Sequence, residues 1–220
     1  MLGETDFTHV VDEIKTLQPD VIINTLNGQS NIAFFTELYK NEINSNKIAV
    51  FSTSIDENSI KKIDSKALKG HYISGAYFNS IDTVANTELK KEYKKHYGKE
   101  FMLTDAGFNL HVAFEFYKRA VFNKKTTQEK VLLNEMKNDS IKTAAGIFYI
   151  ADNNHIYKSV RIAKIKEKGT DVVWSSNNLS QPKPFSTFLN KNFWINEEKK
   201  LYKKWNQSWH AEANKGEYNE

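Results

Sequence analysis

The side chains that could bind a small molecule lie where predicted strands end. Residues 21–24 have the length and apolar character of a buried strand, and a polar segment containing glycine follows at 26–31. Ser52 and Ser54 follow a second predicted strand at 47–51. Loops that leave the carboxyl ends of parallel strands share one edge of the sheet, which is where α/β proteins bind small ligands. Their side chains are uncharged donors and acceptors, so they suit a small, polar, neutral ligand.

Two further residues extend this candidate site. Tyr77 ends the third predicted strand at 71–77 and offers an apolar wall with a hydroxyl. Asp105 begins a long predicted helix, which would have to face the edge from a second unit. Ser30 is the expected N-cap of the helix after the first strand, where backbone N–H groups are free. The complete predicted ligand-binding set is Asn27, Gly28, Ser30, Asn31, Ser52, Ser54, Tyr77 and Asp105. Each of them taken singly also fits an ordinary structural turn.

The patterns typical of enzymes and metal sites are missing from the sequence. The 6 histidines never approach the spacing of metal ligands, and cysteine is absent. No glycine-rich nucleotide loop and no nucleophile elbow occurs. Ser52 or Ser54 could be a nucleophile after a strand, but no base can be assigned to either. We therefore predict a protein that is not an enzyme, with no catalytic residue, no metal site and no cofactor.

Composition describes an ordinary globular protein and argues against two kinds of partner. The net charge of +4 comes from 31 basic and 27 acidic residues, and the lysines are scattered among acidic residues. Nucleic acid is therefore not an expected partner. No apolar run approaches the length of a membrane span, so this segment should not insert into a membrane. The first residues do not have the pattern of a signal peptide and read like the middle of a fold.

Helix and strand patterns alternate over the first part of the chain. Helices are predicted at 6–17, from 30 onward and near 56–63, between the three strands, which implies a parallel sheet with crossover helices. Three more helices are predicted at 82–97, from 105 onward and at 127–138. The second of these should bury Leu110, Phe114, Tyr117 and Val121. Strands are predicted at 146–152, 155–165 and 171–175. The tail at 179–220 should form a helix with recurring tryptophans, which favour packing on the surface of the protein over binding to a partner.

Several stretches resemble one known family. GETDFTHVVDEIKTLQPDVIINTLNGQSNIAFFTELYK is similar to the second-lobe segment of type I periplasmic binding proteins, especially the urea and short-chain-amide receptors of ABC transporters. GHYISGAYFNSIDTVAN resembles their crossover between lobes, and DNNHIYKSVRIAKIKEKGTDVVWSS resembles their closing hairpin. The resemblance covers nearly the whole chain. It implies an α/β fold like that of type I periplasmic binding proteins, with a flavodoxin-like parallel sheet lobe and a partial second lobe, as in the C-terminal part of a two-lobed receptor.

The resemblance also implies domains and a function. Residues 1–77 and 157–176 would form lobe two, residues 78–156 a partial lobe one, and residues 177–220 a tail. The protein would be a periplasmic or other extracytoplasmic receptor, with attachment to the cell surface as a lipoprotein possible. It would capture urea or a short-chain amide between two lobes and deliver it to an ABC transporter permease. One departure concerns Asp105-Ala106-Gly107-Phe108, because amide and urea receptors usually carry a Pro-Met-Glu-like run after that aspartate.

Three alternatives stay open at the level of the sequence. The same fold could be the ligand-sensing domain of a regulator or a sensor kinase. A flavodoxin-like hydrolase or transferase would require a base near Ser52 or Ser54. A nonfunctional remnant with an incomplete sheet should expose apolar surface on the helices of the partial lobe, which favours aggregation or dimerisation.

Overall fold

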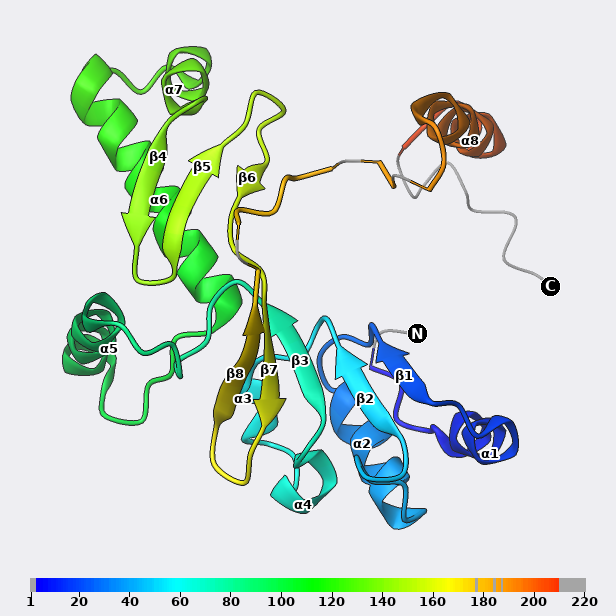
Figure 1. Cartoon of the computed structure of the whole chain (residues 1–220). Coiled ribbons are helices and arrows are strands. Elements are labelled where there is room, and N and C mark those ends of the chain that lie inside the picture. Colours follow the sequence, from blue (N-terminus) through cyan, green and yellow to red (C-terminus); the bar gives the residue numbers. More distant parts are fainter. Residues whose placement is uncertain (1–2, 177, 184, 187, 210–220) are drawn as a thin grey trace. The chain divides into compact units, whose positions relative to one another are not determined.

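The computed structural model describes residues 3–176, 178–183, 185–186 and 188–209 (Figure 1). The chain forms two compact units, residues 1–181 and residues 182–220. The larger unit contains two β-sheets and seven of the described helices, α1 to α7. No helix in the described part of the chain is both long and apolar enough to cross a membrane.

The main sheet has five strands in the order β1-β2-β3-β7-β8. Its strands are β1 (Val21–Asn24), β2 (Ala49–Ser52), β3 (Tyr72–Gly75), β7 (Arg161–Ile165) and β8 (Thr170–Ser175). The first three run parallel to one another, which confirms the arrangement predicted from the alternation of helices and strands. β7 pairs antiparallel with β3 and forms a hairpin with β8. The carboxyl ends of β1, β2 and β3 therefore lie at one edge of the sheet (Figure 1).

Three helices connect the parallel strands, and a fourth precedes them. α1 (Thr8–Leu17) leads into β1, α2 (Ser30–Lys40) connects β1 to β2, and α3 (Glu57–Ile60) and α4 (Ser65–Leu68) connect β2 to β3. One helix was predicted near 56–63, and the structure instead has two short ones. Asp56 accepts a hydrogen bond from the Ser59 backbone N–H at 2.7 Å, and Asp64 accepts one from the Lys66 N–H at 2.8 Å. Each aspartate caps the first turn of a new helix, which explains why the segment divides there.

The remainder of the larger unit holds three helices and a small antiparallel sheet. The helices are α5 (Val84–Tyr97), α6 (Asp105–Lys124) and α7 (Glu129–Met136), and the strands, in the order β4-β5-β6, are β4 (Ser140–Thr143), β5 (Gly146–Ile150) and β6 (Ile156–Tyr157). β4 was not predicted from the sequence. The single strand predicted at 155–165 is also wrong, because β6 pairs with β5 in the small sheet whereas β7 pairs with β3 in the main sheet.

The predicted buried face of α6 is wrong as well. The structure buries Phe108, Val112, Phe116 and Ala120. Three of the four predicted residues face outward instead, with Leu110 72% exposed, Phe114 58% and Tyr117 40%, whereas Val121 is half-buried. The helix is thus apolar on two sides, whereas a surface helix of a small domain normally has one apolar stripe. The described residues cover one of these sides.

One apolar core joins the elements of the larger unit. It includes Phe35 from α2, Leu68 from α4, Ile73 from β3, Phe108 from α6 and Phe148 from β5. The smaller unit contains α8 (Lys191–Lys204), whose N-cap Asn190 accepts a hydrogen bond from the Phe193 N–H at 2.9 Å. The division of the chain into lobe two, partial lobe one and tail stays a prediction.

Candidate ligand-binding site

A buried amide joins the first two parallel strands at their carboxyl ends. Asn24 and Ser52 end β1 and β2 and lie opposite each other in the sheet register. The Asn24 Nδ2 donates to Asn31 Oδ1 at 2.8 Å and to Ser52 Oγ at 2.9 Å, and its Oδ1 accepts from the Leu26 N–H at 2.9 Å. Asn24, Asn31 and Ser52 are all buried. Two predicted site residues, Asn31 and Ser52, are therefore brought together through Asn24, which the sequence analysis had not selected.

The same network holds the loop between β1 and α2. Asn31 Nδ2 donates to the Leu26 carbonyl at 2.7 Å, and the Ser54 hydroxyl donates to that carbonyl as well. Gly28 has a φ of +61°, a left-handed conformation that favours glycine in this turn. Asn27 is exposed, and its Nδ2 reaches the Thr25 carbonyl at 3.4 Å, a long and weak contact. The loop is thus fixed from inside, while the Asn27 amide points outward from this frame.

Ser30 occupies a different position from the one predicted. It is the first residue of α2 and not its N-cap, which is Gln29 and makes no side-chain capping bond. Ser30 is buried, with 2% of its surface exposed, and its Oγ has no hydrogen-bond partner among the described residues. Since buried hydroxyls are nearly always hydrogen-bonded, this oxygen is the kind of group that a bound ligand or an ordered water completes.

Tyr77 and Asp105 come together and connect β3 to α6. Asp105 Oδ1 accepts from the backbone N–H groups of Ala76 at 2.9 Å and Tyr77 at 2.7 Å. The Tyr77 ring is fully buried and stacks on Phe108 with ring centroids 4.2 Å apart. Its hydroxyl donates to Asn86 Oδ1 at 2.9 Å, and burial raises the pKa of that hydroxyl far above its ordinary value. These groups already have partners within the protein, and a role for them in ligand binding stays a prediction.

A half-buried cation that was not predicted from the sequence lies at the same edge of the sheet. Arg161 begins β7 opposite Gly75, donates from Nη1 to the Ala76 carbonyl at 2.5 Å, and donates from Nη2 to the Ala145 carbonyl at 2.7 Å. Burial lowers the Arg161 pKa, and the negative charge of Asp105 offsets part of that effect. An arginine within the strand pattern VRIAKI is the signal that could have revealed it, because a charge inside a buried strand requires partners.

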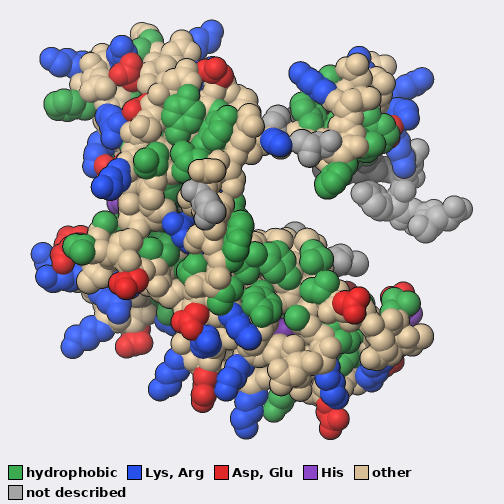
Figure 2. Space-filling view, viewed as in Figure 1, with side chains coloured by type: hydrophobic (Ala, Val, Ile, Leu, Met, Phe, Trp, Pro, Cys, Tyr) green, Lys and Arg blue, Asp and Glu red, His purple; other side chains and the backbone are tan. Residues whose placement is uncertain are grey.

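The edge therefore offers neutral hydrogen-bonding groups on an apolar background. Figure 2 shows hydrophobic side chains gathered over the carboxyl ends of β1, β2 and β3. Uncharged donors and acceptors come from the loop after β1, while the nearby guanidinium of Arg161 donates to two backbone carbonyls. Among the described residues, no group of three or more histidine, cysteine, aspartate or glutamate side chains lies close enough together to hold a metal ion.

Comparison with known families agrees with this architecture. The sequence profile of the periplasmic binding protein domain family matches residues 1–191. The chain belongs to this family. The mixed α/β structure with a sheet of parallel β1, β2 and β3 is the fold of type I periplasmic binding proteins, which confirms the predicted fold class.

Solved structures of ABC transporter binding proteins share this periplasmic binding protein fold. An amino acid ABC transporter substrate-binding protein from Pseudomonas fluorescens Pf-5 has a TM-score of 0.71 at 17% identity, over 83% of this chain and 50% of that one. A solute-binding protein from R. palustris in complex with benzoate has a TM-score of 0.71 at 14% identity, over 85% of this chain and 51% of that one. A leucine-binding protein from Thermotoga maritima MSB8 has a TM-score of 0.66 at 19% identity, over 80% of this chain and 49% of that one.

A curated relative carries a different name. A protein named limonene hydroxylase from Geobacillus stearothermophilus is 30% identical over 124 residues, which are 56% of this chain and 23% of that protein. The chain spans about half the length of the solved binding proteins and less than a quarter of this relative.

Proposed function

We propose that this chain is part of an extracytoplasmic receptor that binds a small, neutral, polar molecule for an ABC transporter, and that the ligand is urea or a short-chain amide. The observation that carries the proposal is the loop between β1 and α2. There the exposed amide of Asn27 precedes the buried Ser30 hydroxyl, which has no partner among the described residues. Both groups suit the carbonyl and N–H groups of an amide.

The hydrogen bonds of Arg161 and the nearby carboxylate of Asp105 support a neutral ligand over one that carries a carboxylate. The names of similar structures mention amino acids, leucine and benzoate, all of which carry a carboxylate. A buried carboxylate requires a cation or several charge-assisted hydrogen bonds. Here both terminal nitrogens of Arg161 donate to backbone carbonyls, and the neighbouring carboxylate of Asp105 adds negative charge. These contacts favour a molecule without charge.

The proposed mechanism is capture by closure of two lobes. A ligand that contacts both lobes stabilises the closed state by its higher affinity for that state. Further chain would complete the lobe that contains α6, and the exposed apolar side chains Leu110, Phe114 and Tyr117 give it a surface to pack on. An ABC transporter permease as partner, an extracytoplasmic location and a lipoprotein anchor all rest on the family and are part of the proposal.

We further propose that the chain binds its ligand without chemically changing it. The serines that could serve as nucleophiles have structural partners, since Ser52 accepts from Asn24 and Ser54 donates to the Leu26 carbonyl. Neither hydroxyl is paired with a histidine or a carboxylate in the described part of the chain, as an activated serine would be. The relative named limonene hydroxylase shares too small a part of its length to carry its activity over to this chain.

Calorimetric titration of the protein purified from the cells that make it tests the proposal. Urea, acetamide, leucine and benzoate are titrated into the wild type, into Asn27→Ala and into Asn134→Ala, a control at an exposed asparagine of α7. We expect saturable binding of urea or acetamide that weakens about tenfold in Asn27→Ala, as for the loss of one hydrogen bond of about 1.4 kcal/mol, and stays unchanged in Asn134→Ala. Binding of leucine or benzoate that depends on Asn27, with no binding of the amides, would overturn the proposal.

A further inference from the structure

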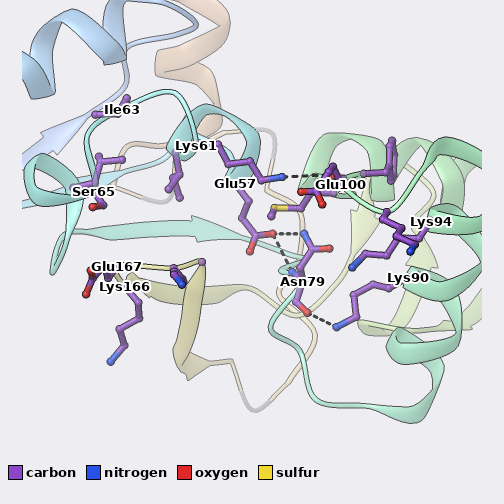
Figure 3. A pocket seen from close by; sticks show the side chains of 17 residues that line it. Glu57, Lys61, Ile63, Ser65, Asn79, Lys90, Lys94, Glu100, Lys166 and Glu167 are labelled. Atoms are coloured by element: carbon purple, nitrogen blue, oxygen red, sulfur yellow. Dashed lines mark hydrogen bonds between the residues drawn. The ribbon is translucent and has the colours of Figure 1, made fainter.

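A second cavity lies away from the candidate site (Figure 3). Its volume is about 660 Å³, within the range of small-molecule sites. On one side it is lined by α3, α4 and the turn between β7 and β8, and on the other side by α5 and residues 99–102. That turn follows Ile165, at the opposite end of β7 from Arg161, and none of the predicted site residues lines the cavity.

The rim of this cavity is strongly basic. Its lysines are Lys61, Lys90, Lys94, Lys99, Lys166 and Lys168, whereas its acidic residues are Glu57, Glu100 and Glu167. Within the described part of the chain, Lys166 is the one rim lysine in an ion pair, with Asp171 at 3.1 Å. Figure 2 shows basic side chains around α4 and the turn between β7 and β8. An anion that entered the cavity would meet several ammonium groups without a carboxylate partner.

Among the described residues, Glu57 forms no ion pair with these lysines, and neutral donors hydrogen-bond to its carboxylate. Its Oε2 accepts from the Asn79 backbone N–H at 3.0 Å and from Asn79 Nδ2 at 2.6 Å, and its Oε1 accepts from the Thr170 hydroxyl at 2.7 Å. Lys90 Nζ donates to the Asn79 carbonyl at 2.8 Å. In Figure 3 Lys90 and Lys94 extend from α5 toward Asn79. These hydrogen bonds hold Asn79 between Glu57 and the ammonium group of Lys90 on α5.

The remaining lining is apolar. Ile60, Ile63 and Leu68 come from α3, α4 and the segment between them, and Phe101 and Met102 come from the segment before α6. Branched aliphatic side chains and a methionine accommodate a flexible hydrocarbon better than a polar body. The cavity therefore has positive charge at its rim and apolar side chains inside. This combination suits an anion with a hydrocarbon chain better than it suits inorganic phosphate, which has no apolar part.

We propose that this cavity binds a medium-chain aliphatic carboxylate, with its carboxylate at Lys90 and Lys94 and its hydrocarbon chain against Ile60, Ile63 and Met102. The elements on its two sides are connected by residues 76–83, which follow β3 and precede α5. A ligand in the cavity contacts both sides at once, so it stabilises the relative position of the two sides in which these contacts form, separately from the ligand at the candidate site.

Binding of octanoate tests the inference. Octanoate, the neutral octanamide and inorganic phosphate are titrated calorimetrically into the wild type, into the double variant Lys90→Gln/Lys94→Gln, and into Lys91→Gln/Lys95→Gln on the same helix. Lys91 and Lys95 do not line the cavity, so the second variant controls for net charge and for effects on α5. We expect one saturable octanoate site that weakens roughly tenfold or more in the first variant and is unchanged in the control.

The titrations with octanamide and phosphate distinguish the contribution of the negative charge from that of the hydrocarbon chain. Octanamide should bind at least roughly tenfold more weakly than octanoate, and phosphate should not compete, since each lacks one of the two features. Equal affinity for octanamide, competition by phosphate, or equal losses in the two double variants would each overturn the inference. Octanoate binding should also persist in Asn27→Ala, because Asn27 does not line this cavity. A failure of the cavity inference can therefore be distinguished from a failure of the proposed receptor function.

Discussion

His71 should make the stability of the protein depend on pH. This residue precedes β3, is 1% exposed and lies against Phe35 with ring centroids 5.4 Å apart. Its Nδ1 accepts a hydrogen bond from the Val50 N–H at 2.9 Å, which requires the neutral ring. Burial lowers the His71 pKa from 6.5 to about 4, and a weak interaction with the Ala67 carbonyl offsets part of that effect. Its Nε2 has no partner with hydrogen-bond geometry among the described residues.

The sign and size of the effect follow from these values. In the unfolded chain His71 binds a proton below about pH 6.5, whereas in the folded protein it stays neutral down to about pH 4. The unfolded state therefore binds more protons in this window, so the free energy of unfolding falls as the pH falls from 6.5 to 4. The loss amounts to about 2 kcal/mol at about pH 5 and about 3 kcal/mol at about pH 4.

Guanidinium chloride unfolding at about pH 7.5 and about pH 5 measures this loss. His71→Leu removes the titration, and His71→Asn does so while keeping an acceptor for the Val50 N–H. Each variant should lose about 2 kcal/mol less than the wild type between the two pH values. His71→Leu should also be about 1–3 kcal/mol less stable at both, since it leaves that N–H unpaired. The control His96→Gln, at an exposed histidine of α5, should keep the wild-type dependence. Equal losses in the wild type and in both His71 variants would refute the reasoning.

Three further substitutions test the packing around the candidate site. Asn24→Ala should lower the free energy of unfolding by about 2–4 kcal/mol in denaturant titrations, because Asn31 and Ser52 each lose a buried hydrogen bond and Leu26 loses a partly buried one. A loss below about 1 kcal/mol would contradict the network. Tyr77→Phe should cost about 1–2 kcal/mol through the bond to Asn86 and leave the near-ultraviolet circular dichroism of the aromatic core unchanged, whereas no loss would mean that this bond is not formed. In the 220-residue chain by itself, Phe114→Ser should reduce self-association in analytical ultracentrifugation and change the unfolding free energy by less than about 0.5 kcal/mol, since Phe114 is 58% exposed there. A larger loss would contradict this exposure.

The parallel part of the fold could be predicted because its signal is local and repeated. Short apolar runs alternate with helical periodicity up to β3, and that order specifies crossover connections. β4 carries no such signal, since its residues SIKT form a strand through pairing with β5, with Lys142 opposite Ile147. The buried face of α6 could not be chosen from the sequence because the helix has two apolar sides. Which side is covered depends on distant elements such as β5, whose Phe148 packs against Phe108.

The candidate site could be predicted in part for a similar reason. Loops after parallel strands meet at one edge whatever their length, so Asn31 and Ser52 could be placed together. Asn24 was missed because the last residue of a strand reads as part of the strand. Arg161 was missed because its position opposite Gly75 depends on an antiparallel pairing between segments far apart in the chain.

Hydrogen exchange of the backbone amides at residues 26–31, with and without saturating acetamide, tests the central claim most directly. The protein purified from the cells that make it is used, and amides of α8 serve as the internal reference. We expect acetamide to slow exchange in this loop, through contacts with Asn27 and Ser30, and to leave α8 unchanged. Saturable binding of acetamide with no change in exchange at residues 26–31 would contradict the assignment of the ligand to this edge of the sheet.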